Sequence, residues 1–269
     1  YRPKRRTRAQ IARENGLEPL AQLIEEQGKA LLPLEPLAAI HLDEEKGIAT
    51  VEDAWQGACD IVAENISDSA EVRKLLRKEL WNVGELVSEL IIDEKEAPEF
   101  LQYRDYSEPV RQLPPHRILA MNRGEDKKAL KINLRCPDEK LIAKVAQKLN
   151  LKEQSPFYTY YHNALTDSYK RLLLPSLERE LRNELTEKAE KQAISVFAAN
   201  LRQLLLTQPI SGHTVLGLDP GYRTGCKTAV IDPNGRILAT TAMYITGSKH
   251  QQEQAEKQFV ELMRKFNIT

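Results

Sequence analysis

The chain has 269 residues, enough for two domains with cores of their own, and its charged residues, 29% of the total, cancel to a formal net charge of +0. Bulk charge therefore favours no class of partner, and only local clusters can indicate one. Three scattered cysteines argue against a zinc or disulfide framework, and no apolar run approaches the roughly 20 residues that span a bilayer. We expect a soluble, cytoplasmic protein without a membrane partner.

The first eight residues form a basic arm. Five of them carry a positive charge, namely Arg2, Lys4, Arg5, Arg6 and Arg8. Lys and Arg displace condensed counterions from phosphate backbones, so the arm is a candidate nucleic-acid contact without sequence readout. A second interpretation stays open, in which these side chains form salt bridges with the acidic helices that follow.

The segment after the arm has the spacing of a helix-turn-helix. Thr7 is a suitable N-cap for a first helix, and Gly16 suits the left-handed position that ends it. The second helix, however, carries Glu18, Glu25 and Glu26 before its first basic residue, and DNA phosphates would repel these acids. The pattern therefore favours helix packing over groove reading.

Residues 1–115 are predicted to form a helical N-terminal region. One amphipathic helix is expected over Glu52–Ile66, and another is expected to start at a cap on Asp68 and to bury apolar residues as far as Leu90. The region ends in an aromatic, proline-rich stretch over residues 99–117. We expect a packed loop there, with base stacking as the alternative.

Residues 116–165 are expected to form a small β-hairpin and helix module. Strands over His116–Ala120 and Ala129–Leu134 would flank a turn at Arg123–Glu125. A short helix would follow over Pro137–Leu149, because its apolar residues recur at helical spacing.

Residues 166–208 are predicted to form a long central helix. Pro175 interrupts the pattern, and Ser176 can restart it. The apolar stripe then persists for roughly 30 residues, about 45 Å of helix. A narrow stripe between charged faces predicts a strut that packs against neighbouring helices. Its members are Leu177, Leu181, Leu185, Ala189, Ala193, Val196, Phe197, Leu201 and Leu204.

The last segment, residues 213–269, has the pattern of three strands and a helix. The first strand ends at Asp219 and is followed by a Pro-Gly turn, and the helix is expected over Lys249–Phe266. A strand that delivers one carboxylate to a turn opens ribonuclease H-like domains, where that acid holds a divalent metal, and also actin-like ATPases. The short motif is weak by itself, because an Asp here can simply cap a tight turn.

A longer string, residues 216–227, is more specific. It resembles the opening of the YqgF-type, ribonuclease H-like domain of the bacterial Tex family of transcription accessory proteins. Further stretches resemble the same family in the same order, at residues 1–8, 16–20, 116–125 and 169–176. The resemblance implies a mainly α fold, in which a helical region with a small hairpin and a long helix precedes the first β-β-β-α part of an α/β domain.

We expect the sequence to be truncated at both ends. It begins without Met, and it stops where a ribonuclease H-like fold is expected to enter its next core strand. Domains of this kind run to roughly 100–150 residues. We therefore expect the front part of a longer protein, and the resemblance implies that helix-hairpin-helix and S1-type RNA-binding modules follow.

The resemblance implies a nucleic-acid-binding transcription accessory protein that uses its nuclease-like domain as a scaffold or binding surface. RNA, DNA or both would be partners, with the transcription machinery as a further partner class. Arg223 and Lys227, beside Asp219, would meet the phosphate backbone. Two-metal chemistry needs several carboxylates around metals about 3.5–4 Å apart. The sequence supplies only Asp219 as a candidate nuclease-like position, so we predict no catalytic residue, metal site or cofactor.

Two other function classes stay open. A metal-dependent nuclease, similar to Holliday-junction resolvases of the YqgF type, would use Mg²⁺ or Mn²⁺ and would need further acids. An actin-like ATPase would need a second phosphate loop and would be stabilised by ATP. The sequence does not distinguish RNA from DNA.

Overall fold

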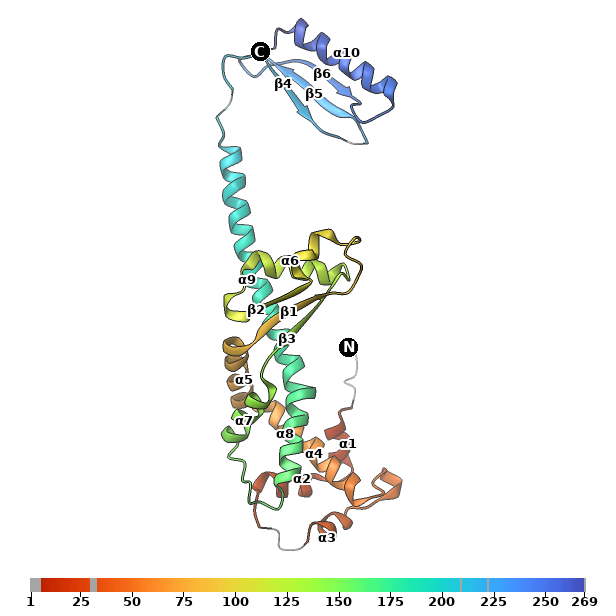
Figure 1. The fold of residues 1–269 in the computed structure, drawn as a ribbon, viewed down its shortest axis with the longest axis vertical. Coiled ribbons are helices and arrows are strands. Elements are labelled where there is room, and N and C mark those ends of the chain that lie inside the picture. The colour runs from red at the N-terminus through yellow and green to blue at the C-terminus, as the bar shows by residue number, and fades with distance from the viewer. Residues whose placement is uncertain (1–5, 30–32, 209, 222, 269) are drawn as a thin grey trace. The chain divides into compact units, whose positions relative to one another are not determined.

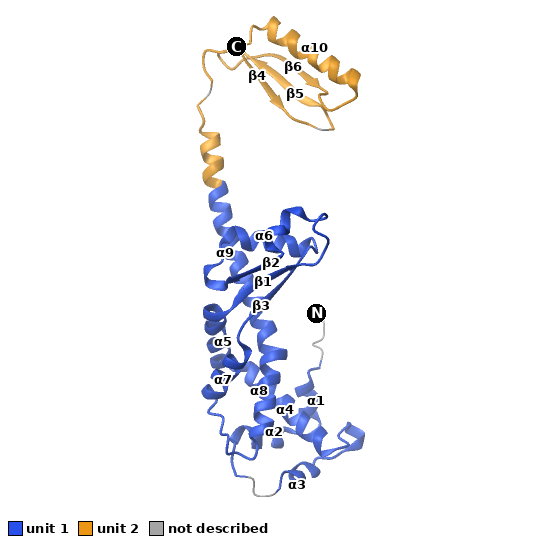
Figure 2. Cartoon of the chain, in the orientation of Figure 1, with its two compact units in different colours: residues 1–197 blue, residues 198–269 orange. Residues whose placement is uncertain are grey.

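Helices predominate in the chain, and two three-stranded antiparallel sheets accompany them (Figure 1). The computed structural model describes residues 6–29, 33–208, 210–221 and 223–268. The chain divides into two compact units, residues 1–197 and 198–269 (Figure 2). This architecture confirms the predicted fold class.

The first helix begins and ends where its caps predict. α1 (Arg8–Glu14) follows Thr7, whose Oγ1 accepts the N–H of Gln10 at 3.0 Å, and Gly16 ends it with a φ of +83°. α2 (Glu18–Glu26) and α3 (Leu34–Ala39) come next. Arg13 of α1 donates to Glu64 and Asn65 at 2.5 and 2.7 Å, both on the helix α4. This arginine therefore ties α1 to its neighbour.

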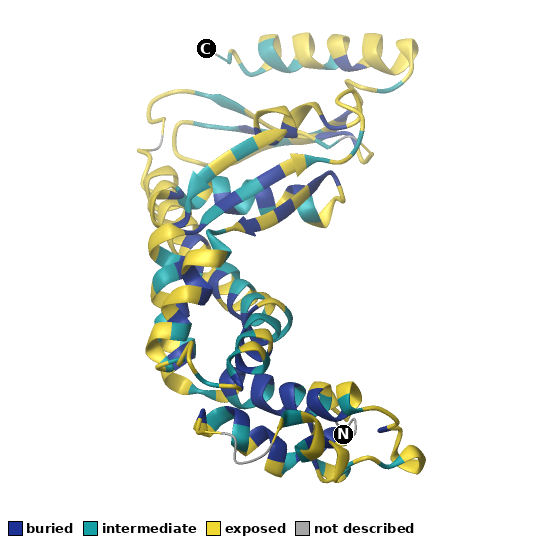
Figure 3. Cartoon of the chain, turned by 60° about the horizontal axis from the view of Figure 1, so that its bottom comes forward, coloured by how far each residue is buried: buried dark blue, intermediate teal, exposed yellow. Residues whose placement is uncertain are grey.

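α4 (Val51–Asp68) is the centre of the core of unit 1. A capping box starts it, in which the N–H of Asp53 donates to Thr50 Oγ1 at 3.1 Å and the N–H of Thr50 donates to Asp53 Oδ2 at 3.0 Å. The predicted apolar stripe is confirmed, because its members are all buried: Ala54, Trp55, Ala58, Ile61, Val62 and Ile66. Figure 3 shows the buried and exposed residues along the helices and strands. α1, α2, α3 and α8 contact α4.

Asp60 of α4 has a largely buried carboxylate, and its side chain is 12% exposed. Burial raises its pKa, although the positive charges of Arg171 and Arg8 lower it. Because the folded pKa exceeds the unfolded one, near 3.9, the stability that Asp60 contributes is present at low pH and is lost as pH rises through the folded pKa. We expect Asp60→Asn to flatten the fall of unfolding free energy with pH in urea titrations. Asp68→Asn, an exposed change one helix turn or more away, should leave the wild-type slope, and an equal slope in all three proteins would contradict this expectation.

The next helix ends earlier than the apolar pattern predicts. α5 (Ala70–Val83) begins after Ser69, whose Oγ accepts the N–H of Val72 at 3.4 Å, so the predicted cap at Asp68 is wrong. The chain leaves the helix at Gly84, and β1 (Glu85–Leu90) alternates buried with more exposed residues. The helix predicted as far as Leu90 is therefore wrong at its end, because pairing on both sides of β1 overrides the helical spacing of its apolar residues.

The first sheet has the order β2–β1–β3, with β2 over Asp105–Pro109 and β3 over Leu130–Arg135. The predicted strand at His116–Ala120 is wrong, because these residues lie in α6 (Pro115–Asp126). Proline is tolerated in the first turn of a helix, where its missing N–H has no intrahelical role. β3 pairs with β1, so long-range pairing replaces the predicted hairpin. Short 3₁₀ turns lie at Glu44–Lys46, Pro98–Tyr103 and Val110–Gln112.

The remaining helices of unit 1 run in sequence. α7 (Asp138–Lys148) and α8 (Tyr158–Asp167) are followed by a π-helical turn, η4 (Ser168–Leu173), and by α9 (Leu174–Leu205). Pro175 is the second residue of α9, so it does not break that helix. The π-helical turn η4 lies directly before this proline, and π turns of this kind occur within α-helices.

The apolar stripe of α9 has two parts. It is buried through Leu177, Leu181, Leu185 and Ala189, as predicted for a packed strut. Beyond Ala189 its members are largely exposed, with Phe197 at 66% and Leu204 at 70% of full exposure. The predicted packing therefore holds for the first part of the helix only.

Unit 2 contains the second sheet, in the order β4 (Val215–Asp219), β5 (Cys226–Ile231) and β6 (Ile237–Met243), and α10 (Lys249–Lys265). Ser248 and Gln251 form a capping box at the start of α10. Ala255 of that helix is buried with Cys226 and Met243. The predicted β-β-β-α order is confirmed.

Candidate nucleic-acid surface

One face of the second sheet carries Asp219 and Lys227, two of the residues that sequence analysis singled out. Residues directly opposite each other in an antiparallel pair share a face, and the register places Asp219 opposite Lys227 and Gly217 opposite Ala229, which in turn lies opposite Thr240. We call the surface formed by these five residues the open face. The alternate residues of β5, Cys226, Thr228 and Val230, are buried on the side of α10.

The open face is shallow and accessible. Gly217, Asp219, Lys227 and Thr240 are all exposed, and the face borders a hollow of about 620 Å³. The small side chains at its centre leave the backbone open to a close approach. Such a surface suits an extended ligand better than a small molecule that needs enclosure.

The two charged side chains of the open face do not form an ion pair with each other. Among the described residues no ion pair joins Asp219 or Lys227 to any partner, although the two lie side by side in register. Arg223, on the turn between β4 and β5, is exposed as well. A Cβ at position 221 would lie 2.5 Å from the Gly225 carbonyl oxygen, so this turn requires glycine there.

Asp219 is the single acid of the open face. Asp232 closes the β5–β6 turn instead, because its Oδ1 accepts the N–H groups of Asn234 and Arg236 at 2.9 and 2.8 Å. Glu253 and Glu256 are exposed on α10. Within the described ranges no three His, Cys, Asp or Glu side chains lie close enough together to hold a metal ion.

The basic arm is described only in part. Arg2, Lys4 and Arg5 lie outside the described residues. Arg6 forms an ion pair with Glu14 at 3.4 Å, and Arg8 is the exposed first residue of α1. These two belong to unit 1, whereas Arg223 and Lys227 belong to unit 2. The Arg6 pair is a contact of the kind that the salt-bridge interpretation predicts.

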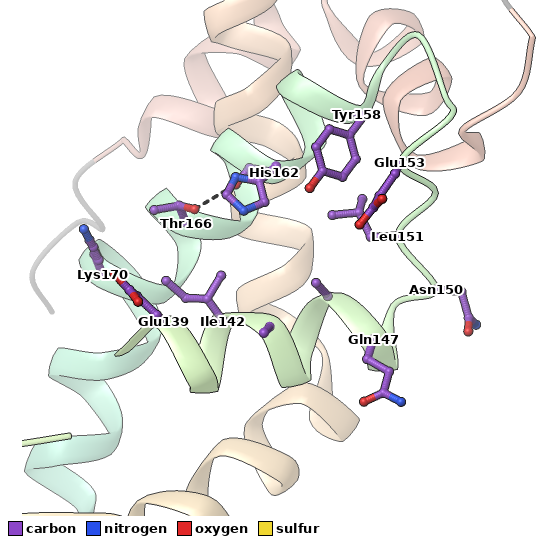
Figure 4. A pocket seen from close by; sticks show the side chains of 12 residues that line it. Glu139, Ile142, Gln147, Asn150, Leu151, Glu153, Tyr158, His162, Thr166 and Lys170 are labelled. Atoms are coloured by element: carbon purple, nitrogen blue, oxygen red, sulfur yellow. Dashed lines mark hydrogen bonds between the residues drawn. The ribbon is translucent and has the colours of Figure 1, made fainter. Parts of the chain in front are cut away.

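Sequence reasoning missed a pocket between α7 and α8 (Figure 4). One wall is formed by residues four apart along α8 and η4, namely Tyr158, His162, Thr166 and Lys170. Their neighbours Phe157 and Tyr161 are buried, whereas Tyr158 and His162 are half-buried. The spacing of four was the available signal. We call this cavity the α7–α8 pocket.

Comparison with known proteins gives consistent matches along the chain. Residues 31–197 match the model of the Tex central region-like family, and residues 213–269 match the Tex protein YqgF-like domain. The uncharacterized protein YdcI of Bacillus subtilis is 38% identical over the whole chain and 37% of its own length. The transcriptional accessory protein Tex of Neisseria gonorrhoeae is 39% identical over 91% of the chain and 33% of its own length.

A human protein is also similar. The S1 RNA-binding domain-containing protein 1 is 36% identical over 89% of the chain and 25% of its own length. The chain thus spans between 25% and 37% of the length of these relatives. In the part of the chain that the structure describes, no helix is both long and apolar enough to cross a membrane. Since the central-region model alone covers more than half of its residues, the chain belongs to the Tex family.

Proposed function

We propose that this chain is part of a nucleic-acid-binding transcription accessory protein, and that its ribonuclease H-like segment holds a phosphate backbone without cutting it. The observation that carries the proposal is a pair of exposed cations, Lys227 on the open face and Arg223 on the turn that leads into β5. The names of two relatives, a transcriptional accessory protein and an S1 RNA-binding protein, support a nucleic-acid ligand. A cytoplasmic location and RNA or DNA as the partner belong to the same proposal.

The charges of the open face support binding without cleavage. Phosphate contacts need cations and exposed backbone, and they supply affinity without sequence readout. Two-metal hydrolysis instead needs several convergent carboxylates. Asp219 is the one acid that the described residues bring to this face, and Lys227 lies beside it. The arrangement therefore favours a binding surface that Asp219 helps to shape.

Reversing both cations tests the proposal. Arg223→Glu combined with Lys227→Glu is expected to weaken the binding of single-stranded RNA or DNA about tenfold or more. The slope of log affinity against log salt should fall by about 1.4, because two phosphate contacts are lost and roughly 0.7 counterions are released per single-strand phosphate. The matched control is Lys257→Glu with Arg264→Glu, two exposed cations of α10 in the same unit. An unchanged slope in the first variant, measured by fluorescence anisotropy, contradicts the role of the open face.

A cleavage assay separates the proposal from a metal-dependent nuclease. Asp219 is exposed at the end of β4, so a metal ion from solvent could reach its carboxylate. Branched and single-stranded substrates are incubated with Mg²⁺ or Mn²⁺ and either the wild type or Asp219→Asn. We expect no turnover from either protein. Cleavage by the wild type that disappears in Asp219→Asn would replace the binding role by a catalytic one.

A further inference from the structure

The walls of the α7–α8 pocket suit a flat ring, and the pocket is large enough to admit one. Its volume is about 720 Å³, within the range of ligand-binding cavities, roughly 300–1,000 Å³. Ile142, Ala143 and Ala146 of α7 form an apolar wall. The rings of Tyr158 and His162 lie on the other side, with centroids 5.8 Å apart and planes tilted by 32° (Figure 4). Two half-buried rings that face an aliphatic wall favour an aromatic ligand.

Some of the polar groups of the pocket already form hydrogen bonds within the chain. The Thr166 hydroxyl donates to the His162 carbonyl oxygen at 2.9 Å, so it stabilises the wall. No hydrogen bond or ion pair within the described residues engages the side chains of Glu153 or Lys170. Figure 4 shows Glu153 at one end of the pocket, near Tyr158 and Leu151, and Glu139 with Lys170 at the other end.

The charge of the lining decides between a phosphate and a base. Two carboxylates, Glu139 and Glu153, and one ammonium group, Lys170, face the pocket. A net negative lining repels phosphate, whereas a carboxylate accepts hydrogen bonds from the exocyclic amino group of a base. Such charge-assisted bonds are stronger than bonds between neutral groups. The pocket therefore suits a base that carries an amino group.

We propose that the α7–α8 pocket binds one unstacked, amino-bearing base of a single strand, that is cytosine, adenine or guanine. The base stacks on Tyr158 and His162, its amino group donates to Glu153, and its phosphates stay outside. Uracil, which offers a carbonyl oxygen in place of the amino group of cytosine, is rejected. The ligand class rests on the proposed nucleic-acid function, while the site belongs to unit 1 and the open face to unit 2.

Cytidine and uridine form the matched pair of probes. Each nucleoside is titrated into the full chain, and chemical shifts of backbone amides are followed by NMR. We expect cytidine to bind about tenfold more tightly than uridine, as one hydrogen bond to a charged group implies, and the largest shifts to lie in α7 and α8. Glu153→Ala is expected to bring cytidine to the level of uridine, whereas Glu26→Ala, which removes an exposed acid of α2, leaves the preference intact.

Variants of the rings test the stacking. His162→Ala is expected to weaken cytidine about tenfold, and His116→Ala, an exposed histidine of α6, should have no effect. Tyr158→Phe keeps the ring and should bind cytidine like the wild type. This conservative change tests the position without the risk of unfolding that a truncation carries. Equal affinities for the two nucleosides, or no shift at millimolar cytidine, overturns the assignment of the pocket.

The two proposals can fail separately. Loss of oligonucleotide binding in the Arg223 and Lys227 variant with cytidine binding intact supports both sites. Oligonucleotide binding that depends on Arg223 and Lys227, without any response to cytidine, overturns the pocket alone. A response to cytidine at α7 and α8 in a chain that binds no oligonucleotide sinks the function proposed for the open face and leaves the pocket as a nucleoside site.

Discussion

Replacing Trp55 with alanine is expected to lower the free energy of unfolding by about 3–5 kcal/mol, the usual cost of truncating a large buried aromatic side chain. Trp55 is only 2% exposed and lies on α4, the helix that most of the unit 1 helices contact. Its ring stacks on Tyr160 with centroids 4.5 Å apart and lies 6.0 Å from Phe157. The change would leave a cavity between α4 and the start of α8, which the close-packed interior cannot fill without moving both helices.

Urea denaturation of the full chain measures this loss, with Trp81→Ala as the matched control. Trp81 lies on α5 and is half-buried, and its exposed ring face is covered by the ammonium group of Lys188 at 4.6 Å from the centroid. A cation–π contact at such a site contributes about 0.5–1 kcal/mol. We expect the control to lose clearly less stability. Equal losses for the two tryptophans would mean that α4 is not the centre of the core.

Gly124→Val is expected to destabilise the chain by about 1–3 kcal/mol through overpacking. Gly124 is buried in the interior of α6. A Cβ built there would lie 2.5 and 2.7 Å from two side-chain atoms of Leu130 and 3.2 Å from Phe100. Glycine normally costs a helix roughly 1 kcal/mol relative to alanine. Here it lets β3 approach the helix, and that packing offsets the cost.

A double substitution shows whether the cause is overpacking. Leu130→Ala removes the atoms that the new valine would meet, so Gly124→Val should cost less in that background than in the wild type. Gly28→Val is the control, because nothing lies within 4 Å of a Cβ at that position and its φ is not in the left-handed range. Thermal unfolding followed by circular dichroism is measured for all five proteins, namely the wild type, the two single variants, the double variant and the control. Identical costs in the two backgrounds would point to helix propensity instead.

Local signals predicted the elements whose partners are close in sequence. Thr7 and Gly16 bound α1 as expected, and the apolar stripe of α4 is buried throughout. The meander of unit 2 follows directly from its turns, because Asp232 caps its own loop and Ser248 caps α10. Each of these features depends on residues within one or two turns of each other, so sequence alone is sufficient.

Elements that depend on distant partners were predicted only in part: the strand over Ala129–Leu134 is confirmed as β3, but residues 85–90 were expected to be helical and form β1. Residues 85–90 and 130–135 pair across a long stretch of chain to form the first sheet, and no local pattern announces that pairing. The turn predicted around Gly124 is a helix, because glycine serves close packing there and not a reversal of the chain. The apolar stripe of α9 likewise continues past Ala189 in the sequence, but its members beyond that residue are exposed.

The two candidate sites differ in the same way: local spacing predicts one of them, and only the tertiary structure shows the other. Sequence spacing was enough to put Asp219 at the end of a strand with Lys227 near it, since strand alternation and a short turn set their face. It was not enough to find the α7–α8 pocket, whose apolar wall comes from one helix and whose rings come from another.

By itself, therefore, the sequence determined the family, the helical frame and the β-β-β-α order of unit 2. Only the tertiary structure decided that β1 lies between β2 and β3, that Gly124 packs under a strand and that Tyr158 and His162 line a cavity. The physical reason is that helix caps and strand alternation act over a few residues, whereas burial is shared between segments that meet only when the chain folds.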